Sequence, residues 1–217
     1  MIDAIQIKVC GLTSLVDAEA AGGCGADYLG FNLYAKSPRH VSLAQFRSMA
    51  GRLPGRHKVA VDVEPAADAL LAMRDAGFDR FQVHFRHDMP LRAIEAWSKA
   101  VGVGKLWLAP KLPPGVDVPE AWLGLTQCIL MDTFDSTLFG GTGRTGDWPK
   151  FRRHRECNPE TTWILSGGLS PENAGEALAG TGARFVDVNS GVESAPGVKD
   201  HARLKAFAAA VRKAAGA

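Results

Sequence analysis

The sequence predicts an α/β fold in which parallel strands, each followed by a helix, close into a (β/α)8 barrel. Short, continuously apolar runs alternate with helical segments in about eight units along the chain. Strands that are apolar throughout are typical of a parallel sheet covered by helices. The length of 217 residues is large for an ordinary domain but normal for one barrel. We therefore expect residues 1–217 to form a single domain.

Each expected strand is a short apolar run that a glycine or a polar segment ends. The strands lie at residues 5–10, 28–33, 58–63, 80–84, 105–108, 127–131, 162–165 and 185–189. An open doubly wound sheet would carry a G-x-G-x-x-G fingerprint after its first strand, whereas this chain has Cys10-Gly11-Leu12-Thr13 there. A closed barrel of the TIM type is therefore favoured, and its active site is expected at the carboxyl ends of the strands.

The expected helices begin at capping residues or at prolines. Ser14 caps the first helix, which a glycine-rich segment at residues 22–25 ends, and Ser42 forms a capping box with Gln45 at the second. The helices lie at residues 15–21, 43–53, 65–76, 90–101, 148–156, 171–178 and 200–215, while residues 110–119 are weakly structured. The loop over residues 132–148 is longer than compact domains usually keep without a function. We expect it to be a mobile cover.

The composition indicates a globular protein without a general attraction to nucleic acid or membranes. Hydrophobic residues make up 46% of the chain and charged residues 22%, and 25 basic against 23 acidic residues leave a net charge of +2. The basic run at residues 152–155 is interpreted as a solvated helix face. No apolar run approaches the ~18 residues needed to span a bilayer. We expect no nucleic-acid and no membrane partner.

The cysteines stand at positions 10, 24, 128 and 157 and form no C-x-x-C pair, and no signal peptide is evident, so a reduced cytoplasmic location is expected. A free cysteine is usually a small buried hydrophobic residue, and we expect this of Cys24, Cys128 and Cys157. Cys10 differs because it ends a strand beside a glycine, where a thiol can be partly exposed and its thiolate favoured. Position alone leaves a base or nucleophile and a packed thiol equally open.

Asp132 follows the apolar strand at residues 127–131, where a carboxylate has no packing role. It is a candidate general acid, although a role as a cap or as an ion-pair partner for the long loop is equally open. A carboxyl group and a thiol that reach one cavity from different strands can divide proton transfer if their surroundings separate their pKa values. Cys10 and Asp132 are therefore a candidate acid/base pair.

Two glycine loops follow the last two strands, at Gly167-Gly168 and at Ser190-Gly191. Either loop alone would more often be a tight turn. Loops after these two strands of a barrel, however, commonly bind phosphate through backbone N–H groups. Their occurrence together predicts a phosphorylated small-molecule substrate.

Two further side chains are candidate substrate contacts. Arg39, after the second strand, can hold a carboxylate through two parallel hydrogen bonds, although a solvated surface arginine is the commoner case. His84 ends the fourth strand and serves either substrate binding or structure. Histidines and acids do not reach a metal-binding spacing such as H-E-x-x-H, so no metal is expected.

Several separate motifs, in order along nearly the whole chain, resemble the phosphoribosylanthranilate isomerase family of tryptophan biosynthesis. They lie at residues 8–13, 30–31, 37–39, 130–133, 140–143, 165–169, 186–193 and 197–200. The resemblance implies an Amadori rearrangement of a phosphoribosylated anthranilate without metal or organic cofactor. We expect a monomer or a homodimer.

The resemblance assigns roles to individual residues of this chain. Cys10 matches the family's general base, and Asp132 its general acid. Arg39 matches the position that holds the anthranilate carboxylate, and Asp187 matches an aspartate near the substrate. The Gly167-Gly168 and Ser190-Gly191 loops match the phosphate cradle.

Two segments depart from the family pattern. His84 is followed by Phe85-Arg86 where the family usually has a glycine and an acid, and the third strand ends in Asp62-Val63-Glu64 instead of Phe-Val-Asn. Two alternatives are kept beside this family. One is the histidine-pathway isomerase, which generally has aspartate where this chain has Cys10. The other is a non-catalytic barrel that binds a phosphorylated metabolite, which the two changed segments leave open.

Overall fold

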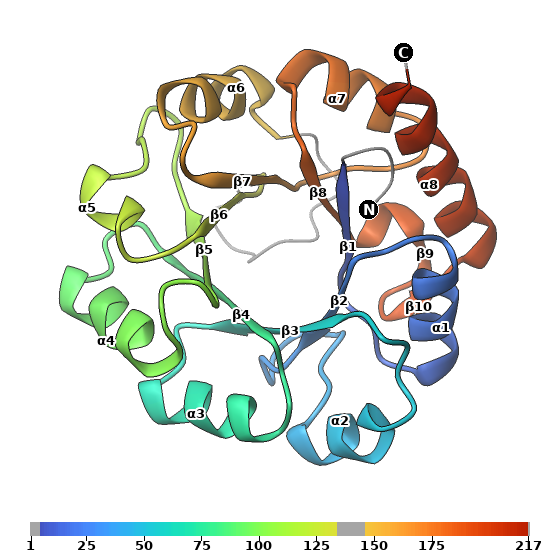
Figure 1. The fold of residues 1–217 in the computed structure, drawn as a ribbon, viewed down its shortest axis with the longest axis horizontal. Helices are drawn as coiled ribbons and strands as arrows, with labels where there is room; N and C mark the ends of the chain where they lie inside the picture. Colours follow the sequence, from blue (N-terminus) through green and yellow to red (C-terminus); the bar gives the residue numbers. More distant parts are fainter. Residues whose placement is uncertain (1–4, 134–145, 217) are drawn as a thin grey trace.

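The computed structural model describes residues 5–133 and 146–216. Eight parallel strands pair in chain order, and the last pairs with the first, so the sheet closes on itself. Figure 1 looks along the barrel, with the strands in the centre and the helices around them. The predicted (β/α)8 TIM barrel is confirmed.

The barrel strands are short, and consecutive strands are joined through helices. The strands are β1 Gln6–Val9, β2 Tyr28–Asn32, β3 His57–Val63, β4 Arg80–Arg86, β5 Leu106–Lys111, β6 Cys128–Met131, β7 Thr162–Leu165 and β8 Phe185–Val188. The helices are α1 Leu15–Gly23, α2 Leu43–Ala50, α3 Ala67–Asp75, α4 Leu91–Val101, α5 Glu120–Leu123, α6 Trp148–Cys157, α7 Ala174–Thr181 and α8 His201–Ala215. After β8 come a short 3-10 helix η1, Ser190–Val192, and a hairpin of β9, Glu193–Ala195, and β10, Val198–Lys199.

An aromatic cluster fills the barrel interior below the carboxyl ends of the strands. The ring centroid of Tyr28 lies 5.0 Å from those of Trp107 and Phe185, and the latter two lie 5.4 Å apart. Side chains alternate along a strand, so Asp187, two residues after Phe185, faces the same interior one step closer to the carboxyl ends. The cluster therefore forms a packed floor below this end of the barrel.

Apolar side chains on the opposite face of the strands hold the helices in place. Phe31 of β2 packs edge-on against Phe46 of α2 at 5.2 Å, and both are fully buried. Each such phenyl group contributes about 1.5–3 kcal/mol to folding. Local caps add to this, because Ser42 and Gln45 form the predicted capping box at α2. The first helix is likewise capped by Ser14, as predicted.

Two strands extend further at their carboxyl ends than predicted. β4 continues to Arg86 and β5 to Lys111, because these residues still pair with one another. His84 therefore lies within β4 and not at its end. Pro110 is tolerated inside β5 because the β5–β6 ladder ends at Leu108 and Ile129, so this part of the strand borders β4 alone among the described strands.

Several helix ends also differ from the prediction. Gly22 and Gly23 lie inside α1, and the chain turns only at Gly25, where φ is 97°. α7 begins at Ala174 and not at Pro171, because the Asn173 side chain ties the preceding turn by bonding the Ser170 N–H and the Gly168 carbonyl. The weakly structured segment is followed by the one-turn helix α5. The predicted mobile cover lies largely outside the described residues.

Candidate active site

A cavity of about 540 Å³ opens among the loops that follow the barrel strands. Eight predicted residues line it: Cys10, Arg39, His84, Asp132, Gly167, Gly168, Asp187 and Ser190. Residues from loops after β1, β2, β6, β7 and β8 thus reach one space. Gly191, the remaining predicted residue, lies behind this lining.

Cys10 directly follows β1 and is only 6% exposed. The partial exposure expected from its position is therefore wrong, although the residue does line the cavity. Burial raises the pKa of the Cys10 thiol, and the ammonium group of Lys8 acts against this rise. The thiol is thus buried at the cavity wall beside a cation.

Asp132 directly follows β6 and lines the same cavity. Desolvation of its carboxyl group raises the pKa of Asp132 to about 6, although Oδ1 accepts a hydrogen bond of 2.8 Å from the Thr133 N–H. A carboxylic acid with this pKa exchanges protons readily near neutral pH. The two groups therefore have different surroundings: the thiol of Cys10 is buried beside the ammonium of Lys8, whereas desolvation dominates at the carboxyl group of Asp132.

Asp187 is held by a lysine below the cavity. Lys8 Nζ lies 2.9 Å from Asp187 Oδ1, and the two side chains are 0% and 5% exposed. Although burial lowers it, the pKa of Lys8 is raised above its usual value by Asp187 and Cys10, so the ammonium stays charged. Sequence reasoning assigned no role to Lys8, although a lysine inside the apolar run of residues 5–10 is as unusual as the carboxylate of Asp132.

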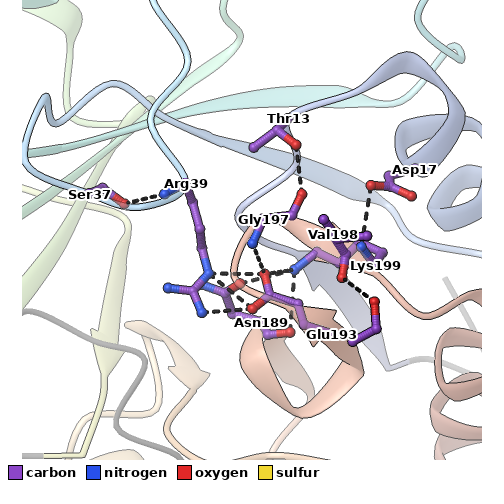
Figure 2. Close-up of polar contacts among 10 residues, drawn as sticks. Thr13, Asp17, Ser37, Arg39, Asn189, Glu193, Gly197, Val198 and Lys199 are labelled. Carbon is purple, nitrogen blue, oxygen red and sulfur yellow. Dashed lines mark hydrogen bonds and ion pairs between the residues drawn. The ribbon is translucent and has the colours of Figure 1, made fainter.

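Arg39 belongs to a buried ion network and is not the solvated surface arginine that was the commoner expectation. Figure 2 shows its guanidinium facing Glu193 of β9, with Nη2 2.7 Å from Oε2 and Nε 2.9 Å from Oε1. Lys199 Nζ lies 2.8 Å from the same Oε1 and 3.0 Å from Asn189 Oδ1. Although burial raises it, the pKa of Glu193 is lowered below its usual value by Arg39 and Lys199. The hairpin that holds Glu193 and Lys199 was not predicted.

His84 projects into the cavity from within β4 and contacts Gln82. The Nε2 atoms of the two side chains lie 2.7 Å apart. Burial and the charge of Lys8 lower the pKa of His84 to about 3, so the ring is neutral near pH 7. A neutral imidazole can orient a substrate group but does not supply a positive charge.

The two glycine loops lie against one another after β7 and β8. Gly167 and Gly168 have φ values of 90° and 62°, which favour glycine. A Cβ on Gly191 would collide with the Leu169 carbonyl oxygen, so η1 approaches the β7 loop backbone to backbone. The Gly191 carbonyl accepts a bond of 2.8 Å from Arg203 Nε. Gly191 therefore fixes the position of the loops and does not line the cavity.

Comparisons with known proteins identify the family. The family model described as N-(5'phosphoribosyl)anthranilate (PRA) isomerase matches residues 7–210. A relative named N-(5'-phosphoribosyl)anthranilate isomerase from Cereibacter sphaeroides is 39% identical over 96% of this chain and 99% of its own. This chain belongs to the N-(5'-phosphoribosyl)anthranilate isomerase family.

Solved structures of phosphoribosylanthranilate isomerases share the fold. The enzyme from Thermus thermophilus has a TM-score of 0.78 at 28% identity, covering 96% of this chain and 99% of its own. A second isomerase, solved with reduced 1-(o-carboxyphenylamino)-1-deoxyribulose 5-phosphate, has a TM-score of 0.74 at 28% identity, with the same coverage of the two chains. The family resemblance predicted from the sequence motifs is thereby confirmed.

Other predicted features lie away from the isomerase cavity. Cys128 is buried as expected, whereas Cys24 is half-buried and Cys157 is exposed, so the expectation is wrong for these two cysteines. The basic run of α6 is not fully solvated, because His154 is buried and stacks on Trp163. Within residues 5–133 and 146–216, neither a cluster of potential metal ligands nor a helix able to cross a membrane is found.

Proposed function

We propose that Cys10 is the general base and Asp132 the general acid of an isomerase reaction at this cavity. As a phosphoribosylanthranilate isomerase, the chain catalyses the Amadori rearrangement of N-(5'-phosphoribosyl)anthranilate to 1-(o-carboxyphenylamino)-1-deoxyribulose 5-phosphate, a step of tryptophan biosynthesis. The observation that carries the assignment is that both side chains line one cavity from different strands, the carboxyl with a pKa of about 6.

The acid acts first, on the closed sugar ring. Protonated Asp132 donates its proton to the furanose ring oxygen, and the bond between this oxygen and C1′ breaks. The nitrogen lone pair forms a double bond to C1′, which gives a protonated Schiff base. A pKa near 6 suits this step because a useful fraction of the carboxyl group carries a proton near neutral pH.

The base then acts on the open chain. The Cys10 thiolate removes the proton from C2′, and the electrons of the C2′–H bond form a double bond between C1′ and C2′. The electrons of the C=N bond move onto nitrogen, so an enolamine results. It tautomerises to the aminoketone when its hydroxyl proton leaves and C1′ gains a proton, and no external oxidant or reductant takes part.

The two ends of the substrate have separate contacts in this proposal. The Gly167-Gly168 and Ser190-Gly191 loops bind the phosphate through backbone N–H groups, as barrels commonly do after the last two strands. Arg39 binds the anthranilate carboxylate, and Glu193 holds the Arg39 fork in place. His84 and Asp187 line the cavity between these ends and contact the ribose portion.

Turnover of N-(5'-phosphoribosyl)anthranilate, followed by loss of anthranilate fluorescence, tests the assignment. Cys10→Ala and Asp132→Asn should each lower kcat by about 10²–10⁴-fold, the usual contribution of general acid/base catalysis. Cys157→Ala is the matched control, because this thiol is exposed on α6. Near-normal turnover in either active-site variant would defeat the assignment, and turnover of the histidine-pathway substrate alone would reassign the reaction.

The oligomeric state completes the proposal. The dimeric isomerase from Thermotoga maritima has been solved as monomers generated from it, and one such chain has a TM-score of 0.74 and 29% identity to this protein. Because this barrel contains the proposed base and acid in one chain, either a monomer or a homodimer is compatible with activity. The mass in solution, from light scattering after size exclusion, decides between them.

A further inference from the structure

Lys8 is a fully buried lysine in the interior of the barrel. Its side chain is 0% exposed, and it does not line the cavity whose wall includes Cys10 and Asp187. Burying an ammonium group is costly unless it is paired. The ion pair of 2.9 Å with Asp187 supplies one partner, but an ammonium has three donors. Lys8 cannot touch a substrate, so any role in the reaction must pass through a neighbour.

Cys10 is the second neighbour. The two residues are separated by Val9 on one strand, so their side chains project to the same side. Gly30 of β2 lies beside both: a Cβ there would be 2.9 Å from Lys8 Cε and 3.1 Å from Cys10 Sγ. The end of the lysine side chain and the sulfur atom therefore crowd the same small space, which only a glycine leaves open.

Charged groups act on the Cys10 thiol from three further elements. Lys8 and Lys199 of β10 favour the thiolate by their charges, and Asp187 of β8 disfavours it. Arg39, in the loop after β2, also interacts favourably with the thiolate charge. Lys8 is foremost among these cations.

We propose that Lys8 is the positioning residue of the general base: its ammonium is the counter-ion that favours the thiolate form of Cys10 against the effect of burial, and Asp187 holds the ammonium in place. This inference rests on the proposed role of Cys10. It assigns a function to the lysine that precedes the cysteine by two residues, and it explains why a charged side chain lies buried in this strand.

The pair Lys8–Asp187 separates this role from a structural one. If the two residues only neutralise each other, removing either charge destabilises the fold and changes the reactivity of Cys10 in the same direction. If Lys8 is the counter-ion of the thiolate, removing Lys8 raises the pKa of Cys10 and removing Asp187 lowers it. The two changes therefore shift the thiol in opposite directions.

The test is the pH dependence of alkylation of Cys10 by iodoacetamide, read by mass spectrometry of the peptide. Cys24→Ser and Cys157→Ser remove the two more accessible thiols, and Cys128, whose pKa burial raises to about 12, stays as an internal control. Lys8→Met should slow alkylation near neutral pH by about 10-fold or more, since an adjacent opposite charge shifts a pKa by about 1–3 units. Lys8→Arg should restore most of the rate, and Asp187→Asn should exceed the unsubstituted rate.

Two results would overturn the inference: an unchanged Cys10 profile in Lys8→Met, or shifts of the same sign in Lys8→Met and Asp187→Asn. If Lys8→Met does not fold, the double variant Lys8→Met/Asp187→Asn removes both buried charges and tests the same point. Its Cys10 should alkylate more slowly than in the parent chain, and an equal rate would refute the role of Lys8. Alkylation needs no substrate, so this outcome is independent of the turnover test of Cys10 and Asp132.

Discussion

Glu193 holds one edge of the Arg39 guanidinium in a two-point ion pair, with Nη2 2.7 Å from Oε2 and Nε 2.9 Å from Oε1. A guanidinium has a second edge, formed by Nη1 and Nη2, with the same fork geometry. The side chain of Arg39 is 11% exposed and lines the cavity. A substrate carboxylate therefore meets an arginine whose orientation is already set, which lowers the entropy lost on binding.

Replacing Arg39 should affect substrate binding, whereas replacing Glu193 should affect the stability of the fold. Arg39→Ala should raise KM by roughly 10- to 100-fold, because a hydrogen bond to a charged group is worth about 1.5–3 kcal/mol, and it leaves Glu193 paired with Lys199 at 2.8 Å. Glu193→Ala should instead lower the free energy of unfolding by about 3–5 kcal/mol, because buried cations lose their counter-ion. Urea unfolding and steady-state kinetics measure both. Inhibition by inorganic phosphate should be unchanged in Arg39→Ala, and equal stability losses in the two variants would contradict this account.

Asp132→Asn should stabilise the folded chain in a pH-dependent way. The pKa of Asp132 is raised from 3.8 to about 6 in the fold, so between these values the folded state holds a proton that the unfolded state has released. The free energy of unfolding of the parent chain therefore falls as pH rises from about 4 to 6, by up to about 3 kcal/mol. The asparagine variant lacks this loss. In urea titrations it should exceed the parent at pH 7.5 by much more than at pH 4, and a pH-independent difference would refute the raised pKa.

Gly191→Ala should weaken phosphate binding. The added Cβ would collide with the Leu169 carbonyl and push η1 away from the β7 loop, and such overpacking typically costs about 1–3 kcal/mol. We expect a higher KM and a higher inhibition constant for inorganic phosphate. Gly175→Ala is the matched control, because its Cβ would meet nothing within 4 Å in α7. The control should keep both constants, and equal effects in the two variants would show that Gly191 does not position the cradle.

Much of this arrangement follows from local sequence. The end of an apolar strand is visible in the sequence, and in a parallel barrel every such end lies on the same rim. This is why Cys10, Asp132 and the loop at Gly167-Gly168 were predicted together and do line one cavity. His84 was placed at a strand end that the pairing of Arg86 with Lys111 moves further on. That error arose because the length of a strand depends on its neighbour, which local sequence does not contain.

The sequence by itself determined the order of strands and helices, the family, and the candidates for base, acid and phosphate cradle. Only the tertiary structure decided which charged side chains pair with one another. Lys8 and Asp187 are 179 residues apart and Arg39 and Glu193 are 154 apart, and each pair meets only because the barrel closes and the last hairpin folds back onto the rim. The physical reason is that burial and a nearby opposite charge set a pKa and an orientation, and both depend on which distant strand lies beside the residue. Thus the thiol at position 10 was visible in the sequence, whereas the lysine that acts on it became identifiable only in the fold.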